Sequence, residues 1–176
     1  MLKTIGMIAR WKPVHLGHAA VLRAIRSHAE RALIGIGSSN RYNLRNPFTL
    51  EETKDMLQLV LAEQDAYELI PVPDLDDGPR WRLMVKEIFG ELDLFVTDNP
   101  YVANLLRNDY RVMRPVELIP RAEYIRVDGT MVRGRMARGE EWESLVPEGV
   151  TVYIKSNQLD VRFRREFGLE MIASLA

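Results

Sequence analysis

The sequence contains no cysteine, and this absence removes several kinds of site at once. A disulfide framework, a zinc site with thiolate ligands and a cysteine nucleophile are all excluded, and a chain without thiols suits a reducing cytoplasm. Neither sign of charge is in excess, because 24 Lys and Arg residues stand against 25 Asp and Glu residues. General binders of nucleic acid or anionic membranes usually carry a clear cationic excess. We therefore expect neither partner, and any anion site must be local.

Long apolar runs are also missing. No stretch approaches the roughly 18 apolar residues that a membrane span requires, and the apolar run at the N-terminus is too short for a signal peptide. A chain of 176 residues can bury most of its apolar surface without disulfides or a structural metal. We expect a soluble, cytoplasmic protein with one domain over residues 1–176.

Short apolar runs alternate with longer segments in which apolar residues recur at helical spacing. This alternation is typical of parallel strands joined by crossover helices. We expect strands at 4–9, 32–37, 68–72 and 92–97, and helices ending near residue 30 and spanning 80–89 and 101–107. A further helix should follow Thr49 and Glu52, which have capping-box spacing. The predicted fold is α/β, a Rossmann-like parallel sheet with helices on both faces.

Two details of this prediction depend on single residues. The first helix should carry Val21, Leu22, Ile25 and Ala29 on one apolar face. Near the C-terminus, Asp128 is placed to cap a helix, and the run 150–154 has the composition of another strand. We expect the C-terminal part to be small and helical.

The most informative segment lies between the first expected strand and the first expected helix. It holds two of the three histidines and reads Ala9-Arg10-Trp11-Lys12-Pro13-Val14-His15-Leu16-Gly17-His18. In an open parallel sheet, ligands bind beyond the carboxyl ends of the strands, where helix N-termini attract anions. His15 and His18 could donate hydrogen bonds to oxygens that gain charge in a transition state. Gly17 would let a phosphate approach the backbone closely, and Arg10 adds positive charge.

Other interpretations of the histidines are open at this point. His15 and His18 could be a helix-capping residue and a surface residue. Residues three apart share a helix face and could bind zinc, although the loop offers no acidic or thiolate third ligand. His28, near the end of the first helix, is best interpreted as an ordinary surface histidine.

The order of motifs resembles one known family over nearly the whole chain. An H-x-G-H sequence after the first strand is similar to the signature of the nucleotidyltransferase superfamily. The wider pattern Arg10-x-x-Pro13-Val14-His15-x-Gly17-His18 resembles the archaeal-type nicotinamide-nucleotide adenylyltransferases. Later segments resemble that family in its order and at its spacings: Ile34-Gly35-Ile36-Gly37-Ser38, Arg45-Asn46-Pro47-Phe48-Thr49, Pro71-Val72-Pro73-Asp74, Arg80-Trp81 and Asp98-Asn99-Pro100.

A second motif follows in the last third of the chain. Asp128-Gly129-Thr130-Met131-Val132-Arg133 resembles the family's Ser-Gly-Thr-x-Val-Arg sequence for ATP. Asp128 stands where the family has serine, and its carboxylate would repel a polyphosphate unless it turns to the backbone or to a metal. Gly78 stands where the family usually has an asparagine, and the resemblance implies that this removes a polar contact to the nicotinamide carboxamide. Three other exchanges look tolerable: Ala9 and Trp11 replace Gly and Phe, and Thr53 replaces Arg.

The resemblance implies transfer of AMP from ATP to nicotinamide mononucleotide, with Mg²⁺ accompanying ATP, in a cytoplasmic homo-oligomer. It implies no metal site built from the chain's own side chains. The implied roles are catalysis by His15, His18 and Arg133, ATP binding by Arg10, Gly17, Arg45, Asp128 and Thr130, and acceptor binding by Trp81 and Asn99. Trp81 would be the platform on which nicotinamide stacks, although it could equally be a core residue at the start of its helix.

Three rival functions are compatible with the sequence. Gly78 favours another acceptor, such as phosphopantetheine, a flavin or a sugar phosphate, or CTP in place of ATP. Asp128 favours a regulator that binds nucleotide without turnover. The histidine pair alone would also suit a metal-dependent hydrolase.

Overall fold

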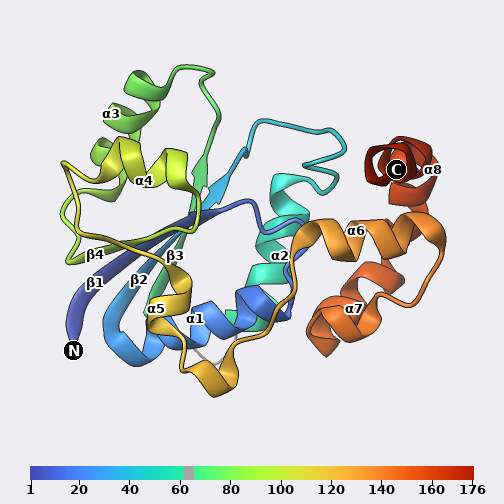
Figure 1. Cartoon of the computed structure of the whole chain (residues 1–176), viewed down its shortest axis with the longest axis horizontal. Helices are drawn as coiled ribbons and strands as arrows, with labels where there is room; N and C mark the ends of the chain where they lie inside the picture. The colour runs from blue at the N-terminus through green and yellow to red at the C-terminus, as the bar shows by residue number, and fades with distance from the viewer. Residues whose placement is uncertain (62–65) are drawn as a thin grey trace. The chain divides into compact units, whose positions relative to one another are not determined.

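The computed structural model describes residues 1–61 and 66–176 (Figure 1). Five strands form one sheet: β1 (Leu2–Ala9), β2 (Ala29–Gly37), β3 (Tyr67–Val72), β4 (Leu94–Val96) and β5 (Val112–Met113). All neighbouring strands are parallel, in the order β3-β2-β1-β4-β5. The helices are α1 (Leu16–His28), α2 (Leu50–Leu61), α3 (Gly78–Phe89), α4 (Pro100–Leu106), α5 (Pro115–Leu118), α6 (Gly129–Arg138), α7 (Glu148–Ser156) and α8 (Leu159–Leu175), with short 3-10 turns at Arg121–Glu123 and Glu143–Leu145.

Contacts divide the chain into two compact units. Unit 1 contains the described residues of Met1–Arg10, Ala20–Asn40 and Gln64–Tyr124. Unit 2 contains those of Trp11–Ala19, Arg41–Glu63 and Ile125–Ala176. The sheet lies wholly in unit 1, whereas unit 2 is built from helices and loops. The expectation of one nucleotidyltransferase domain over 1–176 stays a prediction.

The sheet of unit 1 confirms the predicted α/β class. Figure 1 shows α3 and α4 on one side of the strands and α1 on the other. On the α3 and α4 side, side chains of the sheet and of both helices form one buried cluster: Leu33, Ile70, Val72, Val85, Phe89, Phe95, Leu106 and Tyr110. Alternate residues of a strand point to opposite faces, so the buried Ile34 and Ile36 face away from this cluster. The run 32–37 is nearly all apolar because both faces of β2 are covered.

The boundary between the first helix and the second strand differs from the prediction, and the strand expected at 92–97 is shorter, Leu94–Val96. Ala29 is the first residue of β2 and pairs with Leu2 of β1, so the first helix ends at His28 and Ala29 is not on its apolar face. Val21, Leu22 and Ile25 are buried as expected. Ala29 is also buried, but by strand pairing, and a small apolar residue at a helix end carries no signal that separates the two states.

The predicted strand at 150–154 is wrong, because these residues lie in helix α7. Val150 and Ile154 are fully buried while Val152 is 59% exposed, which is the spacing of a helix and not of a strand. The run of β-branched residues favours a strand locally. Packing of α7 against α2 overrides that preference, and the Tyr153 hydroxyl donates a hydrogen bond of 2.7 Å to Asp55 of α2.

A partly buried ion pair connects α8 to the start of α2 inside unit 2. Arg162 donates to both carboxylate oxygens of Glu52, at 2.5 and 2.7 Å, and to the Pro47 carbonyl at 3.0 Å. Glu52 also completes the predicted capping box, since its carboxylate accepts the Thr49 N–H at 2.9 Å and the Thr49 hydroxyl accepts the Glu52 N–H at 3.2 Å. Bonds from Arg162 and Thr49 lower the pKa of Glu52 against the effect of burial. This pair fixes the loop that carries Arg45.

No helix in the described part of the chain has both the length and the apolar character needed to cross a membrane.

Candidate functional site

The two histidines cap the first helix reciprocally. His15 is the residue before α1, and His18 is the third residue within it. The His18 N–H donates to Nδ1 of His15 at 3.3 Å, and the His15 N–H donates to Nδ1 of His18 at 3.4 Å. This is the pattern of a capping box, with imidazoles in place of the usual hydroxyl and carboxylate. Because each Nδ1 accepts a backbone proton, the ring proton of each histidine is assigned to Nε2.

The two imidazole rings are stacked, with His15 buried and His18 partly buried. Their centroids lie 3.6 Å apart with an interplanar angle of 20°, and Trp11 packs against His18 at 4.6 Å. Burial lowers the pKa of His15 to about 4, with Asp128 raising it and Arg133 lowering it to smaller extents. Burial and the neighbouring His15 lower the pKa of His18 well below its usual value, against the effect of the Pro13 carbonyl. Both rings are therefore neutral near pH 7, and each carries one ring N–H.

Arg133 belongs to the same arrangement. It lies in the second turn of α6, and its Nη1 donates to the Lys12 carbonyl at 2.8 Å, which ties α6 to the loop that precedes the histidines. Asp128 caps α6 as predicted, because its Oδ1 accepts the Met131 N–H at 2.8 Å. The carboxylate is thus turned to the backbone. Unit 2 therefore brings together two segments that are far apart in the sequence, one with His15 and His18 and the other with Asp128 and Arg133.

Gly17 is required by a close approach of the chain to itself. A Cβ atom at this position would lie 2.8 Å from the Val127 carbonyl oxygen and 3.1 Å from Nδ1 of His15. The first of these neighbours is backbone and cannot turn away. The close contact in the structure is with the segment that leads into α6, and the approach of a phosphate to Gly17 stays a prediction.

We expect the low histidine pKa values to make folding sensitive to acid. His15 is protonated below about pH 6.5 in the unfolded chain but only below about pH 4 in the folded chain. The free energy of unfolding should therefore fall as the pH falls across that range. The slope is about 1.4 kcal/mol per pH unit for each such histidine. Urea denaturation at pH 7, 6 and 5 measures it.

The matched variant for this experiment is His15→Asn, because asparagine is a good N-cap residue but does not titrate. Its free energy of unfolding should fall less steeply with acid than that of the original chain. Parallel pH profiles for the two proteins would contradict the proposed burial of a neutral His15.

The remaining residues of the predicted ATP site are exposed. Arg10 follows β1 and belongs to unit 1, whereas Arg45 and Thr130 belong to unit 2. Arg45 lies in a tight loop in which Oδ1 of Asn43 accepts its N–H at 3.0 Å. Thr130 lies in the first turn of α6. Their roles toward a ligand stay predictions. His28 is exposed at the end of α1, with a ring nitrogen 2.7 Å from the Ala24 carbonyl, as expected of a surface histidine.

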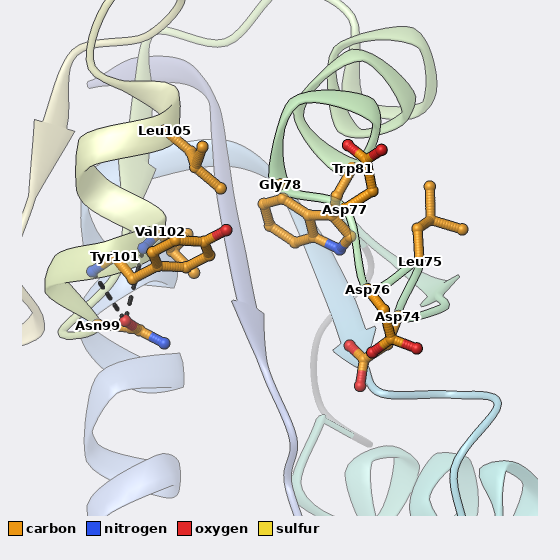
Figure 2. A pocket seen from close by; sticks show the side chains of 10 residues that line it. All are labelled: Asp74, Leu75, Asp76, Asp77, Gly78, Trp81, Asn99, Tyr101, Val102 and Leu105. Atoms are coloured by element: carbon orange, nitrogen blue, oxygen red, sulfur yellow. Dashed lines mark hydrogen bonds between the residues drawn. The ribbon is translucent and has the colours of Figure 1, made fainter.

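Unit 1 holds a cavity of about 290 Å³ between the first turns of α3 and α4 (Figure 2). Trp81 and Asn99, the predicted acceptor-binding residues, both line it. Trp81 is partly buried and also packs against the apolar cluster of the sheet, so it is both a core residue and a wall of the cavity. Asn99 caps α4, since its Oδ1 accepts the N–H groups of Tyr101 and Val102 at 3.0 and 3.5 Å.

Sequence reasoning missed several residues of this cavity. Tyr101 projects into it, and Asp74, Asp76 and Asp77 form an acidic rim. No spacing rule links Tyr101 to the acidic segment, because the two come together only through the packing of α3 and α4. The acidic run itself was visible, but it was not connected with a ring-binding site.

Among the described residues, no group of three or more histidine, aspartate or glutamate side chains is placed to hold a metal ion.

Comparison with known proteins agrees with these features. A family model described as cytidylyltransferase-like matches residues 9–135. The nicotinamide-nucleotide adenylyltransferase of Thermococcus onnurineus is 36% identical over 154 residues, covering 84% of this chain and 80% of the relative. That of Methanococcus vannielii is 34% identical over 146 residues, covering 82% and 83%.

A solved structure has the same fold. It is a bifunctional NMN adenylyltransferase/ADP ribose pyrophosphatase from Francisella tularensis, crystallised with AMP and a manganese ion. The TM-score is 0.69 at 17% identity, and the match covers 94% of this chain and 53% of the other, so this chain spans about half of that protein's length. The matched family model and the two relatives show that this chain belongs to the cytidylyltransferase-like family and to its nicotinamide-nucleotide adenylyltransferases.

Proposed function

We propose that this chain transfers the adenylyl group of ATP to nicotinamide mononucleotide, forming NAD and pyrophosphate. An oxygen of the acceptor phosphate attacks the α-phosphorus of ATP in line. The bond from the α-phosphorus to the bridging oxygen breaks, and pyrophosphate leaves with the electron pair. No covalent intermediate with the enzyme is needed, so catalysis rests on positioning and on stabilisation of charge.

The observation that carries this proposal is the neutral, stacked histidine pair with Arg133 tied to the same loop. A buried imidazole whose proton sits on Nε2 can donate to a phosphate oxygen without first losing or gaining a proton. Arg133 supplies the fixed positive charge that the two neutral rings lack, and a guanidinium can contact a phosphate with two N–H groups. Arg45 and Thr130, which lie in the same unit as the histidines, are assigned to the ATP phosphates as supporting contacts, and the same role for Arg10 stays a prediction.

The orientation of Asp128 bears on the repulsion that its carboxylate would exert on the ATP phosphates. A carboxylate in a polyphosphate site would weaken ATP binding, but here Oδ1 accepts a backbone N–H at the start of α6. A hydrogen bond at this position and the helix dipole both stabilise the negative charge. This geometry gives no support to a regulator that has lost turnover.

The charge of the cavity in unit 1 supports a pyridine mononucleotide as the acceptor. Its lining includes three aspartates, the Trp81 indole and the Tyr101 phenol, and it includes no lysine, arginine or histidine. The nicotinamide ring of the mononucleotide is a cationic pyridinium. Cations are attracted to indole faces and to carboxylates. A carboxylate on the ring, as in nicotinic acid mononucleotide, would meet the acidic rim.

Magnesium is the proposed divalent cation, and the residues present fit it when it arrives with ATP. Magnesium is commonly held by one or two protein oxygens together with the substrate's phosphates. The Asp128 carboxylate and the Thr130 hydroxyl, both exposed at the start of α6, are the oxygens that would hold it. Its chemistry would be to neutralise charge on the departing pyrophosphate.

Pyrophosphate release from ATP and Mg²⁺ tests the function. We expect turnover with nicotinamide mononucleotide, a kcat/KM about tenfold or more lower with nicotinic acid mononucleotide because like charges would meet in the cavity, and none with phosphopantetheine. Reactions without acceptor are the control. Faster turnover of phosphopantetheine than of either pyridine mononucleotide would refute the acceptor assignment. The cytoplasmic location and the homo-oligomeric state stay predictions.

A further inference from the structure

Gly78 and Tyr101 meet at the wall of the cavity. Gly78 is the first residue of α3, and Tyr101 lies in the first turn of α4. A Cβ atom on Gly78 would collide with the Tyr101 hydroxyl and would lie 3.3 Å from its Cζ atom and 3.4 Å from Cδ2 of Leu105. The hydroxyl therefore occupies the volume that any side chain at position 78 would need. The position of the Tyr101 phenol thus depends on the absence of a side chain at residue 78.

We propose that the Tyr101 hydroxyl is the polar group that contacts the substituent of the acceptor's ring and thereby sets acceptor specificity. This assignment rests on the proposed function, because it presupposes that the acceptor's ring enters the cavity. Figure 2 shows the hydroxyl directed across the cavity toward the Trp81 indole. A ring that stacks on Trp81 would present its edge to this hydroxyl.

Several other polar atoms of the cavity are held by the protein itself. Oδ1 of Asp77 accepts the Arg80 N–H at 2.9 Å, and Oδ1 of Asn99 accepts the Tyr101 N–H. The Asp74 backbone is held by Asn40, whose side chain both donates to it and accepts from it at 2.9 and 2.8 Å. Within the described residues, the Tyr101 hydroxyl has no hydrogen-bond partner. It is therefore available to a ligand, and it is the polar atom of the cavity that lies against Gly78.

The chemistry of a phenol suits a carboxamide. A phenol hydroxyl both donates and accepts hydrogen bonds, and a carboxamide carries one group of each kind. The two helix caps beside it, Asp77 for α3 and Asn99 for α4, hold the backbone on both sides of the contact. Tyr101 therefore supplies the polar contact that Gly78 itself does not make.

Removal of the hydroxyl alone is the first test. We expect Tyr101→Phe to lower kcat/KM for nicotinamide mononucleotide about 3- to 10-fold through KM, as for loss of one neutral hydrogen bond. The KM for ATP should not change. With the mononucleotide of unsubstituted pyridine, which has no group for the hydroxyl to contact, the original chain and Tyr101→Phe should have equal kcat/KM. Equal losses with both acceptors, or no loss with either, would overturn the assignment.

A pair of substitutions tests the shared volume. Gly78→Asn alone should displace Tyr101 and raise the KM for nicotinamide mononucleotide. In Gly78→Asn combined with Tyr101→Leu, the shorter side chain leaves room for the asparagine amide, and the KM should return toward its original value. Tyr101→Leu alone is the control and should stay impaired. Independent, additive effects of the two substitutions would overturn the proposal.

Failure of this inference is distinguishable from failure of the function. If the original chain does not turn over any pyridine mononucleotide, both proposals fall. A second outcome is that the original chain turns over nicotinamide mononucleotide while Tyr101→Phe prefers it to the mononucleotide of unsubstituted pyridine as strongly as the original chain does. In that case only the role of Tyr101 is refuted.

Discussion

Replacing His18 with alanine should lower kcat by about 100- to 1,000-fold, the usual effect of deleting one donor that stabilises charge in a transition state. The ring is partly buried in a stack with His15, and Trp11 packs against it. Nothing else at this position of α1 can replace that donor. Pyrophosphate release under saturating ATP and acceptor measures the loss.

Two further variants separate catalysis from folding. His18→Gln keeps an acceptor that can reach the His15 N–H, as glutamine does in a capping box, but it lacks the imidazole donor. It should unfold at nearly the original temperature and still lose activity. His28→Ala, at the exposed end of the same helix, is the matched control and should keep full activity. Wild-type kcat in His18→Gln would eliminate the proposed role of the ring.

Substituting Gly17 with alanine should reduce kcat about 100-fold, because displacement of catalytic groups by about 1 Å is enough for such a loss. The new methyl group would lie 2.8 Å from the Val127 carbonyl and 3.1 Å from the His15 ring. Relief of the clash must move either the histidine pair or the segment that leads to α6. Steady-state kinetics with nicotinamide mononucleotide would reveal the change mainly in kcat.

The control for Gly17→Ala is Gly149→Ala in α7, which also lies in unit 2. A Cβ at Gly149 would contact only Cβ of Leu59, at 3.8 Å, an ordinary van der Waals distance. Alanine is the better helix former, so this variant should be fully active and at least as stable. If Gly17→Ala kept the same kcat as Gly149→Ala, the close approach of the chain at Gly17 would not matter for catalysis.

The candidate site illustrates which features are visible in a sequence. The H-x-G-H segment stood out because its residues are neighbours in the chain, and its helical spacing already placed both rings on one face. Two interpretations of the histidines stood side by side: that they cap the helix, and that they donate hydrogen bonds to a phosphate. In the structure they are compatible, since Nδ1 of each ring caps the helix and Nε2–H remains the donor.

The sequence by itself determined the features that depend on local spacing. The alternation of strands and helices, the capping box at Thr49 and the cap at Asp128 all follow from side chains acting within a few residues of their own backbone. The structure confirms each of them. It also confirms the parallel sheet, since apolar runs that alternate with helices are typical of parallel strands joined by crossovers.

Only the tertiary structure decided the features that join distant segments. The run 150–154 became a helix because α2 offered a partner for Val150 and Ile154 at helical spacing. The Arg162–Glu52 pair, the close approach of Val127 to Gly17 and the meeting of Tyr101 with Gly78 connect residues that no local pattern relates. Local propensities amount to fractions of a kcal/mol per residue, whereas burying an apolar side chain contributes several times more. Where the two disagree, packing determines the result.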